Sequence, residues 1–192
     1  MIWIWLGLAV VIVAAGGWLY RSRGTYHLET VQAGVLYRCG LQSYREFENA
    51  LRQVKPRTVV SLVDDREIAD PEKNQFKREM ESHVAGSATQ VMRVPVRLGG
   101  WPDGDELQRF LAVVADPKKQ PVLVHCAQGV RRTGMFVAAY QISILGYDKD
   151  KAKASLLTFG HSDRTVNDVK RFIDAYDPVA QRMVTELPPS NE

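Results

Sequence analysis

The sequence of 192 residues is poor in thiols and imidazoles, with two cysteines and four histidines. Two cysteines exclude a disulfide scaffold, and they leave too few thiols for a structural zinc site unless several histidines join them. The net charge of +3 is too small to indicate a nucleic-acid-binding protein. Hydrophobic residues at 45% and charged residues at 24% exclude a disordered or fibrous chain. The two cysteines are therefore either buried thiols or reactive ones.

Charged side chains are absent from residues 1–20. This apolar stretch approaches the roughly 20 residues that a helix needs to cross a bilayer, and aromatic residues lie near both of its ends. Arg21 and Arg23 follow at once, and no basic residue precedes the stretch. We therefore predict a transmembrane signal anchor over residues 1–23, with the following domain in the cytoplasm.

A secretory signal peptide and a buried core helix are the two alternatives for this segment. A signal peptide would place a cleavage site near Val13-Ala14-Ala15, but the basic n-region is missing and the apolar stretch is long. A core helix of a soluble domain would show a polar face, which the segment lacks.

The remaining sequence alternates strand and helix patterns, which predicts an α/β domain with a central, largely parallel sheet flanked by helices. Short apolar or β-branched strands are predicted at 34–38, 57–63, 90–96 and 121–125. Helices are predicted at 43–53, 71–83, 105–115, 133–145, 148–157 and 165–176. The folded domain is expected over residues 24–185, followed by a disordered tail at 186–192.

Residues 122–134 form the segment in which we predict the reactive site. A buried strand leads there through a loop into a helix. Unpaired amides of the loop and the first helical turn converge there with the helix dipole and form an anion site, which favours the thiolate of Cys126. Gly129 allows a loop conformation closed to other residues. Arg132 can hold two phosphate oxygens with its planar fork, and Thr133 can donate to the cysteine sulfur. This arrangement predicts a nucleophile at the bottom of a phosphate cradle.

His125-Cys126, five further residues and Arg132-Thr133-Gly134 resemble the signature loop of the cysteine-based protein tyrosine phosphatases. The small domain resembles their dual-specificity branch, of the bacterial and atypical type. The resemblance covers roughly residues 25–180 and excludes the predicted anchor. The loop and its supporting residues are then His125, Ala127, Gln128, Gly129, Val130, Arg131 and Thr133.

The resemblance implies a phosphoric monoester hydrolase that works in two steps without a metal or other cofactor. Cys126 attacks phosphorus to form a phosphocysteine, an acid protonates the leaving oxygen, and water then releases phosphate. Arg132 and the loop amides stabilise the equatorial oxygens. The expected substrate is a phosphorylated protein or a phospholipid.

Two alternative functions stay open at this point. A phosphoinositide or inositol-phosphate phosphatase would use the same chemistry, but relatives of that kind tend to carry basic residues where Ala127 and Gln128 stand. A catalytically inactive phosphate-binding module would not need both Cys126 and Arg132.

Trp101-Pro102-Asp103 spells the tripeptide that supplies the general acid in larger tyrosine phosphatases. Asp103 is therefore predicted to be the third catalytic residue, on a loop that glycines make flexible. Asp105 is predicted to cap the following helix, and Glu106 in its first turn is expected to stay ionised. The alternative is that Asp103 is a solvated aspartate of a turn.

Three further residues keep open interpretations. His125 is expected to support the loop rather than to react. Arg131 is interpreted either as a contact for an acidic substrate or as a solvated surface arginine. Cys39 is either a buried thiol or a partner that protects Cys126 from over-oxidation.

Overall fold

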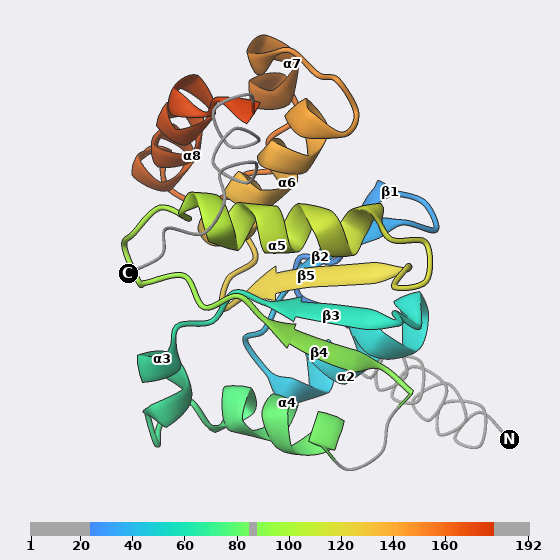
Figure 1. Ribbon diagram of the computed structural model, residues 1–192. Coiled ribbons are helices and arrows are strands. Elements are labelled where there is room, and N and C mark those ends of the chain that lie inside the picture. Colours follow the sequence, from blue (N-terminus) through green and yellow to red (C-terminus); the bar gives the residue numbers. More distant parts are fainter. Residues whose placement is uncertain (1–23, 85–87, 179–192) are drawn as a thin grey trace, which may run out of the picture.

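One five-stranded sheet with helices on both faces forms the centre of the molecule (Figure 1). The structure is a computed structural model, and it describes residues 24–84 and 88–178. The strands are β1 (Glu29–Gln32), β2 (Leu36–Gly40), β3 (Thr58–Ser61), β4 (Gln90–Arg93) and β5 (Val122–Cys126). The helices are α2 (Tyr44–Val54), α3 (Asp65–Ala69), α4 (Asn74–Val84), α5 (Gly104–Ala115), α6 (Arg131–Ser143), α7 (Lys149–Ala154) and α8 (Asp163–Ala175).

The strand order is β1-β2-β5-β3-β4, and only the β1–β2 pair is antiparallel. The predicted α/β fold with helices flanking the sheet is confirmed, as a mixed sheet whose antiparallel member is an edge strand. Every residue of β3 and β5 is buried, which explains why these strands appear in the sequence as nearly continuous apolar runs.

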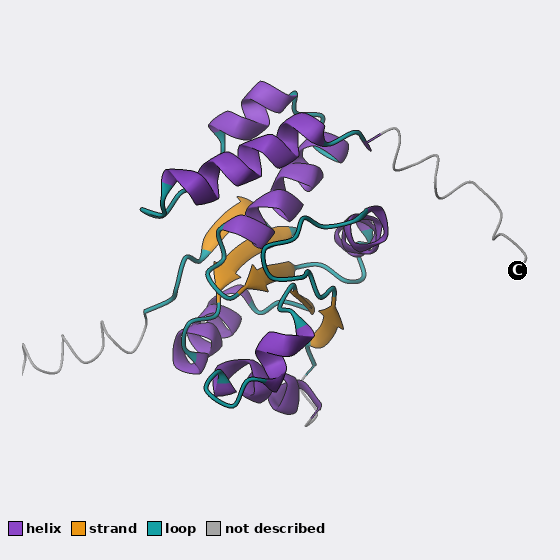
Figure 2. Cartoon of the chain, turned by 90° about the vertical axis from the view of Figure 1, so that its left-hand side faces the viewer, coloured by secondary structure: helices purple, strands orange, loops and turns teal. Residues whose placement is uncertain are grey.

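The sheet separates two hydrophobic clusters. Helices α5 and α6 cover one face, with α7 and α8 packed on the outside of α6, whereas α2 and α4 cover the other face (Figure 1). On the first face, Phe110 of α5 meets Phe136 of α6 edge to face, with ring centroids 5.2 Å apart. On the second face, Phe47 and Phe76 are fully buried. The parallel strands all point their carboxyl ends to one edge of the sheet, and Figure 2 looks onto that edge.

The region between β3 and β4 differs from the predicted single helix over 71–83. It forms two helices, α3 and α4, and the first begins at the capping residue Asp64. The Asp64 side chain accepts from Arg66 N at 3.0 Å, and Glu67 reaches back to Asp64 N at 3.2 Å. This capping box starts a helix that lies outside the predicted range, because the pattern stands directly after a buried strand.

Strands β1 and β2 also differ from the predicted elements, each for a local reason. The strand predicted from residue 34 starts later, because Gly34 has a φ of +74° in a turn between β1 and β2. Strand β1 was missed, since its sequence ETVQ is mostly polar and lies at an edge of the sheet. The predicted helix start at Ser43 is confirmed, with Glu46 N donating to Ser43 Oγ at 3.3 Å.

No helix within residues 24–84 and 88–178 has both the length and the apolar character needed to span a membrane. The predicted anchor over 1–23 and the predicted tail over 186–192 lie outside the described residues.

Candidate active site

Cys126 ends β5 at the carboxyl edge of the sheet, and α6 begins at Arg131. The residue that caps α6 is Val130, whose side chain cannot accept a hydrogen bond, so the amides of the first turn are left for another acceptor. Gly129 N donates to Cys126 Sγ at 3.1 Å. The sulfur therefore lies where the loop amides converge, as the sequence predicts.

Gly129 has a φ of +70°, which side-chain-bearing residues rarely adopt. A Cβ at this position would lie 2.4 Å from the backbone oxygen of Cys39. The loop can therefore pass this close to β2 only with glycine at position 129.

Arg132 lines the same cleft as Cys126, and its side chain is buried. It forms a bidentate ion pair with Glu67 of α3. Its Nη1 donates to Glu67 Oε1 at 2.5 Å and its Nη2 donates to Glu67 Oε2 at 3.1 Å. Burial by itself would lower the pKa of Arg132, but the bonds to Glu67 and the surrounding negative charge raise it above its ordinary value. The guanidinium thus stays charged and held in one orientation.

Sequence reasoning missed Glu67. The signal that could have found it is the Asp64-x-x-Glu67 capping pattern, which places a carboxylate at a helix start beside the carboxyl end of β3.

His125 lies behind the loop and is completely buried. Its Nε2 and Glu79 Oε1 share a hydrogen bond of 2.7 Å, and Ser61 Oγ donates to the other oxygen of Glu79 at 3.4 Å. The imidazole ring of His125 also packs against the ring of Phe47, with 4.9 Å between the two ring centroids. The expected supporting position of His125 agrees with these contacts, and Glu79 is a second buried carboxylate that the sequence did not reveal.

Arg131 is not the solvated surface arginine of the second interpretation, because its side chain is largely buried in an ion pair; a contact with an acidic substrate stays a prediction, since Arg131 lines the cleft. Its guanidinium pairs with Asp168 of α8, and it donates to Gly100 O at 2.7 Å and to Gly99 O at 3.0 Å. Trp101 Nε1 donates to the same Asp168 at 3.2 Å. Arg131 therefore ties α8 to the loop that precedes α5.

The hydrogen bond predicted from Thr133 to the sulfur is not formed. Thr133 Oγ1 is buried, and it has no hydrogen-bond partner among the described residues. The amide of Gly129 takes the place beside the sulfur instead.

The prediction for the start of α5 was wrong. Asp103, not Asp105, caps this helix: Glu106 N donates to Asp103 Oδ1 at 2.8 Å, and Asp103 N donates to Glu106 Oε2 at 2.9 Å. Burial raises the pKa of Glu106 above its ordinary value, and the expectation that this carboxylate stays ionised remains a prediction. Asp103 borders a hollow next to α5, not the cleft that holds Cys126. Its assignment as the proton donor stays a prediction.

Cys39 is fully buried, and burial raises the pKa of its thiol. In the β2–β5 register Cys39 lies opposite His125, the residue before Cys126. Because successive strand residues point to opposite faces, Cys39 packs with the α2 side and Cys126 with the α6 side. Cys39 is thus a buried thiol in this structure, and the alternative that it protects Cys126 from over-oxidation stays a prediction.

Arg38 of β2 supports the loop from below. It is nearly buried, its Nη2 donates to Gly129 O at 2.5 Å, and burial lowers its pKa to about 10. In the sequence, residues 34–38 stand out only by their resemblance to the phosphatase family. The contact between Arg38 and the loop could therefore not be predicted.

A cleft of about 320 Å³ opens over Cys126. The lining residues are Gln42, Glu67, Lys73, Gln75, Phe76, Leu98, Gly99, Cys126, Ala127, Gln128, Arg131 and Arg132. Uncharged Ala127 and Gln128 follow the cysteine, while Lys73 and Arg131 add positive charge. The arrangement can bind a tetrahedral anion against a nucleophilic sulfur.

Comparison with known proteins places this site in a family. Residues 21–175 match the family model described as DSP-PTPase phosphatase fused to NAD+ kinase. The dual specificity protein phosphatase TpbA of Pseudomonas aeruginosa is 28% identical over 175 residues, which cover 84% of this chain and 74% of TpbA. The vaccinia virus dual specificity protein phosphatase OPG106 is 32% identical over 83 residues, 43% of this chain and 44% of OPG106.

Solved structures show the same fold. The crystal structure of TpbA aligns with a TM-score of 0.58 and 24% identity, over 80% of this chain and 87% of that one. The catalytic core of Siw14 aligns with a TM-score of 0.61 and 18% identity, over 84% and 91%. The chain thus belongs to the family of DSP-PTPase phosphatases fused to NAD+ kinase, and it is a cysteine phosphatase of the dual-specificity-like type.

Proposed function

We propose that this phosphatase removes phosphate from phosphorylated tyrosine, serine or threonine residues of proteins, through a phosphocysteine on Cys126. One observation carries the proposal: Cys126 Sγ accepts from Gly129 N at 3.1 Å at the bottom of a cleft that Arg132 also lines. A phosphoryl group against this sulfur would meet the loop amides and the guanidinium together.

In the first step, the sulfur attacks phosphorus, the S–P bond forms and the bond to the leaving oxygen breaks. The leaving oxygen takes a proton from an acid, for which Asp103 is proposed. In the second step, the same residue, now deprotonated, takes a proton from water as the water attacks the phosphocysteine; the S–P bond breaks and inorganic phosphate leaves. Arg132 stabilises the equatorial oxygens in both steps, and Glu67 holds it in orientation.

Two observations support a protein substrate. A crystal structure of TpbA holds pTyr, in a Cys-to-Ser variant. The positions directly after Cys126 are the uncharged Ala127 and Gln128, as expected for a cleft that takes a single phosphate rather than a highly phosphorylated ring.

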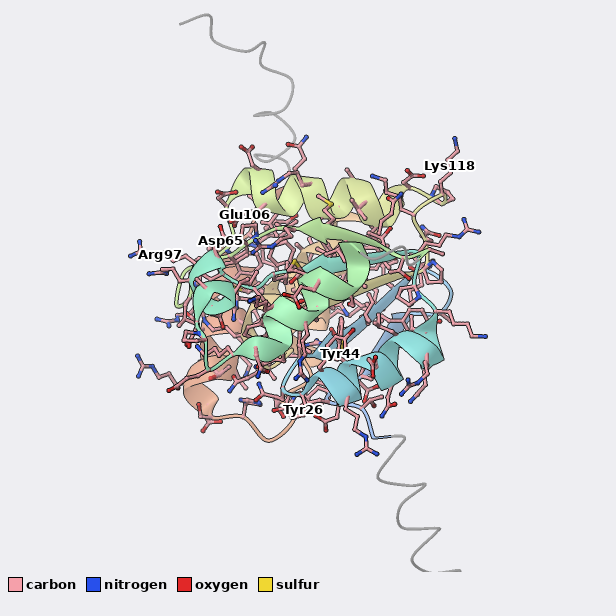
Figure 3. The ribbon with its side chains drawn as sticks, turned by 90° about the horizontal axis from the view of Figure 1, so that it is seen from below. Tyr26, Tyr44, Asp65, Arg97, Glu106 and Lys118 are labelled. Carbon is pink, nitrogen blue, oxygen red and sulfur yellow. The ribbon has the colours of Figure 1, made fainter. Side chains whose placement is uncertain are left out.

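An inositol-phosphate substrate is the second candidate, and it is supported by basic side chains beside the cleft. Lys73 lines both the cleft and an adjoining hollow of about 280 Å³ that Arg66 and Arg97 also border. Asp64 and Glu67 border the same hollow, however, and Asp64 pairs with Arg66 there. Arg97 is exposed and lies at the outer edge of the molecule, on the side of Asp65 (Figure 3). Siw14, a structural relative, is called a PP-IP phosphatase.

A substrate panel separates the candidates. Phosphotyrosine and phosphothreonine peptides, soluble inositol phosphates and phosphoinositide vesicles are compared by kcat/KM, in the native chain and in Arg97→Ala. A protein phosphatase prefers the peptides, and Arg97→Ala changes their kcat/KM less than about threefold. Preference for inositol phosphates, with a loss of more than about tenfold in Arg97→Ala, would instead establish the second candidate. Failure to hydrolyse even a generic aryl phosphate would identify an inactive binding module.

We also propose that residues 1–23 anchor the enzyme in the membrane, with the catalytic domain over 24–185 in the cytoplasm and a disordered tail at 186–192. The uncharged first 20 residues and the basic pair Arg21 and Arg23 support this topology. A C-terminal fusion to an alkaline phosphatase that works only in the periplasm should be inactive. An active fusion would contradict the cytoplasmic orientation.

A further inference from the structure

The first described residues of the chain run directly beneath the phosphate-binding loop. Gly40 N, at the end of β2, donates to Tyr26 O at 2.9 Å. A Cβ on Gly40 would lie 2.6 Å from the Tyr26 ring and 2.7 Å from the carbonyl of Gln128. Gly40 therefore lets residues 26–27 and the loop share one tightly packed site.

His27 contacts the loop itself, because its Nδ1 lies 2.8 Å from Gln128 O. A carbonyl oxygen can only accept, so Nδ1 carries the hydrogen and donates it. The N–H of the same peptide unit belongs to Gly129, and it donates to Cys126 Sγ at 3.1 Å. One peptide unit thus receives a hydrogen bond from His27 at its oxygen and gives one to the sulfur at its nitrogen.

His27 is held in an unusual conformation. Its φ is +53°, and its ring is stacked between Tyr26, at 3.9 Å between centroids, and Phe159, at 4.1 Å. Phe159 also has a positive φ, of +48°, and lies 5.6 Å from the guanidinium carbon of Arg38, which bonds Gly129 O. Non-glycine residues in the left-handed region cost free energy and persist where the surroundings fix them, often at functional sites.

We propose that His27 is a positioning residue for the nucleophile. Its bond to Gln128 O fixes the plane of the Gln128–Gly129 peptide and polarises it, so that the Gly129 N–H points at the Cys126 sulfur and donates more strongly. His27 is connected to the sulfur through this peptide, by its own bond to Gln128 O and the bond from Gly129 N to the sulfur. The inference rests on the proposed role of Cys126, and it connects the reactivity of the sulfur to the segment next to the predicted anchor.

Two substitutions separate the hydrogen bond from the ring. His27→Phe keeps an aromatic ring between Tyr26 and Phe159 but removes the donor. His27→Asn removes the ring but keeps an amide donor close to the position of Nδ1, and asparagine tolerates a positive φ. His161→Phe is the control, because His161 meets His27 only edge-on at 5.7 Å between centroids.

The readout is the alkylation rate of Cys126 by iodoacetamide as a function of pH in the full chain, with the labelled cysteine identified by peptide mass. This measurement needs no substrate, so it tests the inference even if the proposed function fails. We expect His27→Phe to move the midpoint of the rate curve to higher pH and to lower kcat/KM for an aryl phosphate about tenfold. His27→Asn and His161→Phe should stay within about threefold of the native chain.

Two results would overturn the inference. One is an unchanged alkylation curve in His27→Phe. The other is an equal loss in His27→Phe and His27→Asn, because the ring or the fold would then matter rather than the donated hydrogen bond. Thermal melting of each variant shows whether the folded state persists at the assay temperature.

Discussion

Arg132 and Glu67 form two hydrogen bonds at the wall of the cleft, and both side chains are buried. Arg132 could be predicted from its spacing after Cys126, because that spacing puts it in the first turn of α6. Glu67 could not be predicted, since it lies far away in the sequence and only the fold brings α3 next to the loop. The sequence therefore predicted the arginine at the cleft but not the carboxylate that orients it.

Replacing Glu67 tests this orientation. Glu67→Gln keeps a side chain that can reach back to Asp64 N, so α3 keeps its capping box. It removes the charge facing Arg132, and we expect kcat/KM for an aryl phosphate to fall about tenfold with little change in melting temperature. Arg132→Lys should cost roughly 10²–10³-fold, because lysine lacks the planar fork. Glu72→Gln, at an exposed position before α4, is the matched control. An unchanged kcat/KM in Glu67→Gln would refute the orienting role.

Asp103 has two separable roles, one seen as the cap of α5 and one predicted as the proton donor. Asparagine caps a helix as well as aspartate does but cannot act as a general acid. We expect Asp103→Asn to keep the melting temperature and to lower kcat by roughly 10²–10⁴-fold on a substrate with a poor leaving group. Asp103→Ala should lose the activity and, in addition, about 1 kcal/mol of stability.

A good leaving group provides the internal control, because it departs without a proton and should be turned over almost normally by Asp103→Asn. If Asp103→Asn retains full activity on the poor leaving group, Asp103 is only a cap. The same kinetics in Glu106→Gln then test the neighbouring carboxylate, whose pKa burial raises.

At the scale of elements, Asp168 joins α8 to the start of α6 and to the loop before α5. It pairs with Arg131, accepts from Trp101 and accepts from Arg171 at 2.9 Å. The individual helices could be predicted from caps and apolar spacing, and α6 and α8 start within two residues of their predicted positions. The contacts between them could not, because Arg131, Trp101 and Asp168 lie in separate segments with no shared pattern.

Asp168→Asn should loosen the loop before α5. We expect a rise in KM of about three- to tenfold and a smaller change in kcat, since the loop borders the cleft while the sulfur and Arg132 are untouched. Arg171→Ala is the control, because Arg171 reaches the same carboxylate from an exposed position and does not contact the loop. A change in kcat alone would contradict this account.

The contribution of Asp168 to the stability of the fold should depend on pH in a defined direction. Burial would raise the pKa of Asp168, but the hydrogen bonds from Trp101 and Arg131 and the nearby positive charges lower it below the ordinary value of 3.8. A carboxylate with a lowered pKa stabilises the fold above its ordinary pKa, and this contribution disappears as the pH falls through the lowered value. The stability difference between the native chain and Asp168→Asn should therefore be constant near neutral pH and shrink below about pH 4. Urea unfolding at several pH values measures it.

At the scale of the whole molecule, the alternation of strands and helices predicted the α/β class and the central, mostly parallel sheet. The strand order was beyond the sequence, because it depends on which apolar runs pair across long separations. That order places β5 between β2 and β3, so that Arg38 lies beneath the loop while Leu62 O, just after β3, accepts from Arg132 at 3.1 Å. The site is thus assembled from segments that follow one another at the same edge of the sheet.

The formation of a phosphocysteine on Cys126 is the most direct test of the whole account. The native chain is mixed with excess aryl phosphate, quenched in acid within milliseconds and measured by intact mass and peptide mapping. We predict one added phosphoryl group on the peptide that contains Cys126, and none in Cys126→Ser, which should still bind tungstate because the loop amides and Arg132 remain. Turnover without a phosphorylated Cys126, or near-normal turnover in Cys126→Ser, would contradict the account.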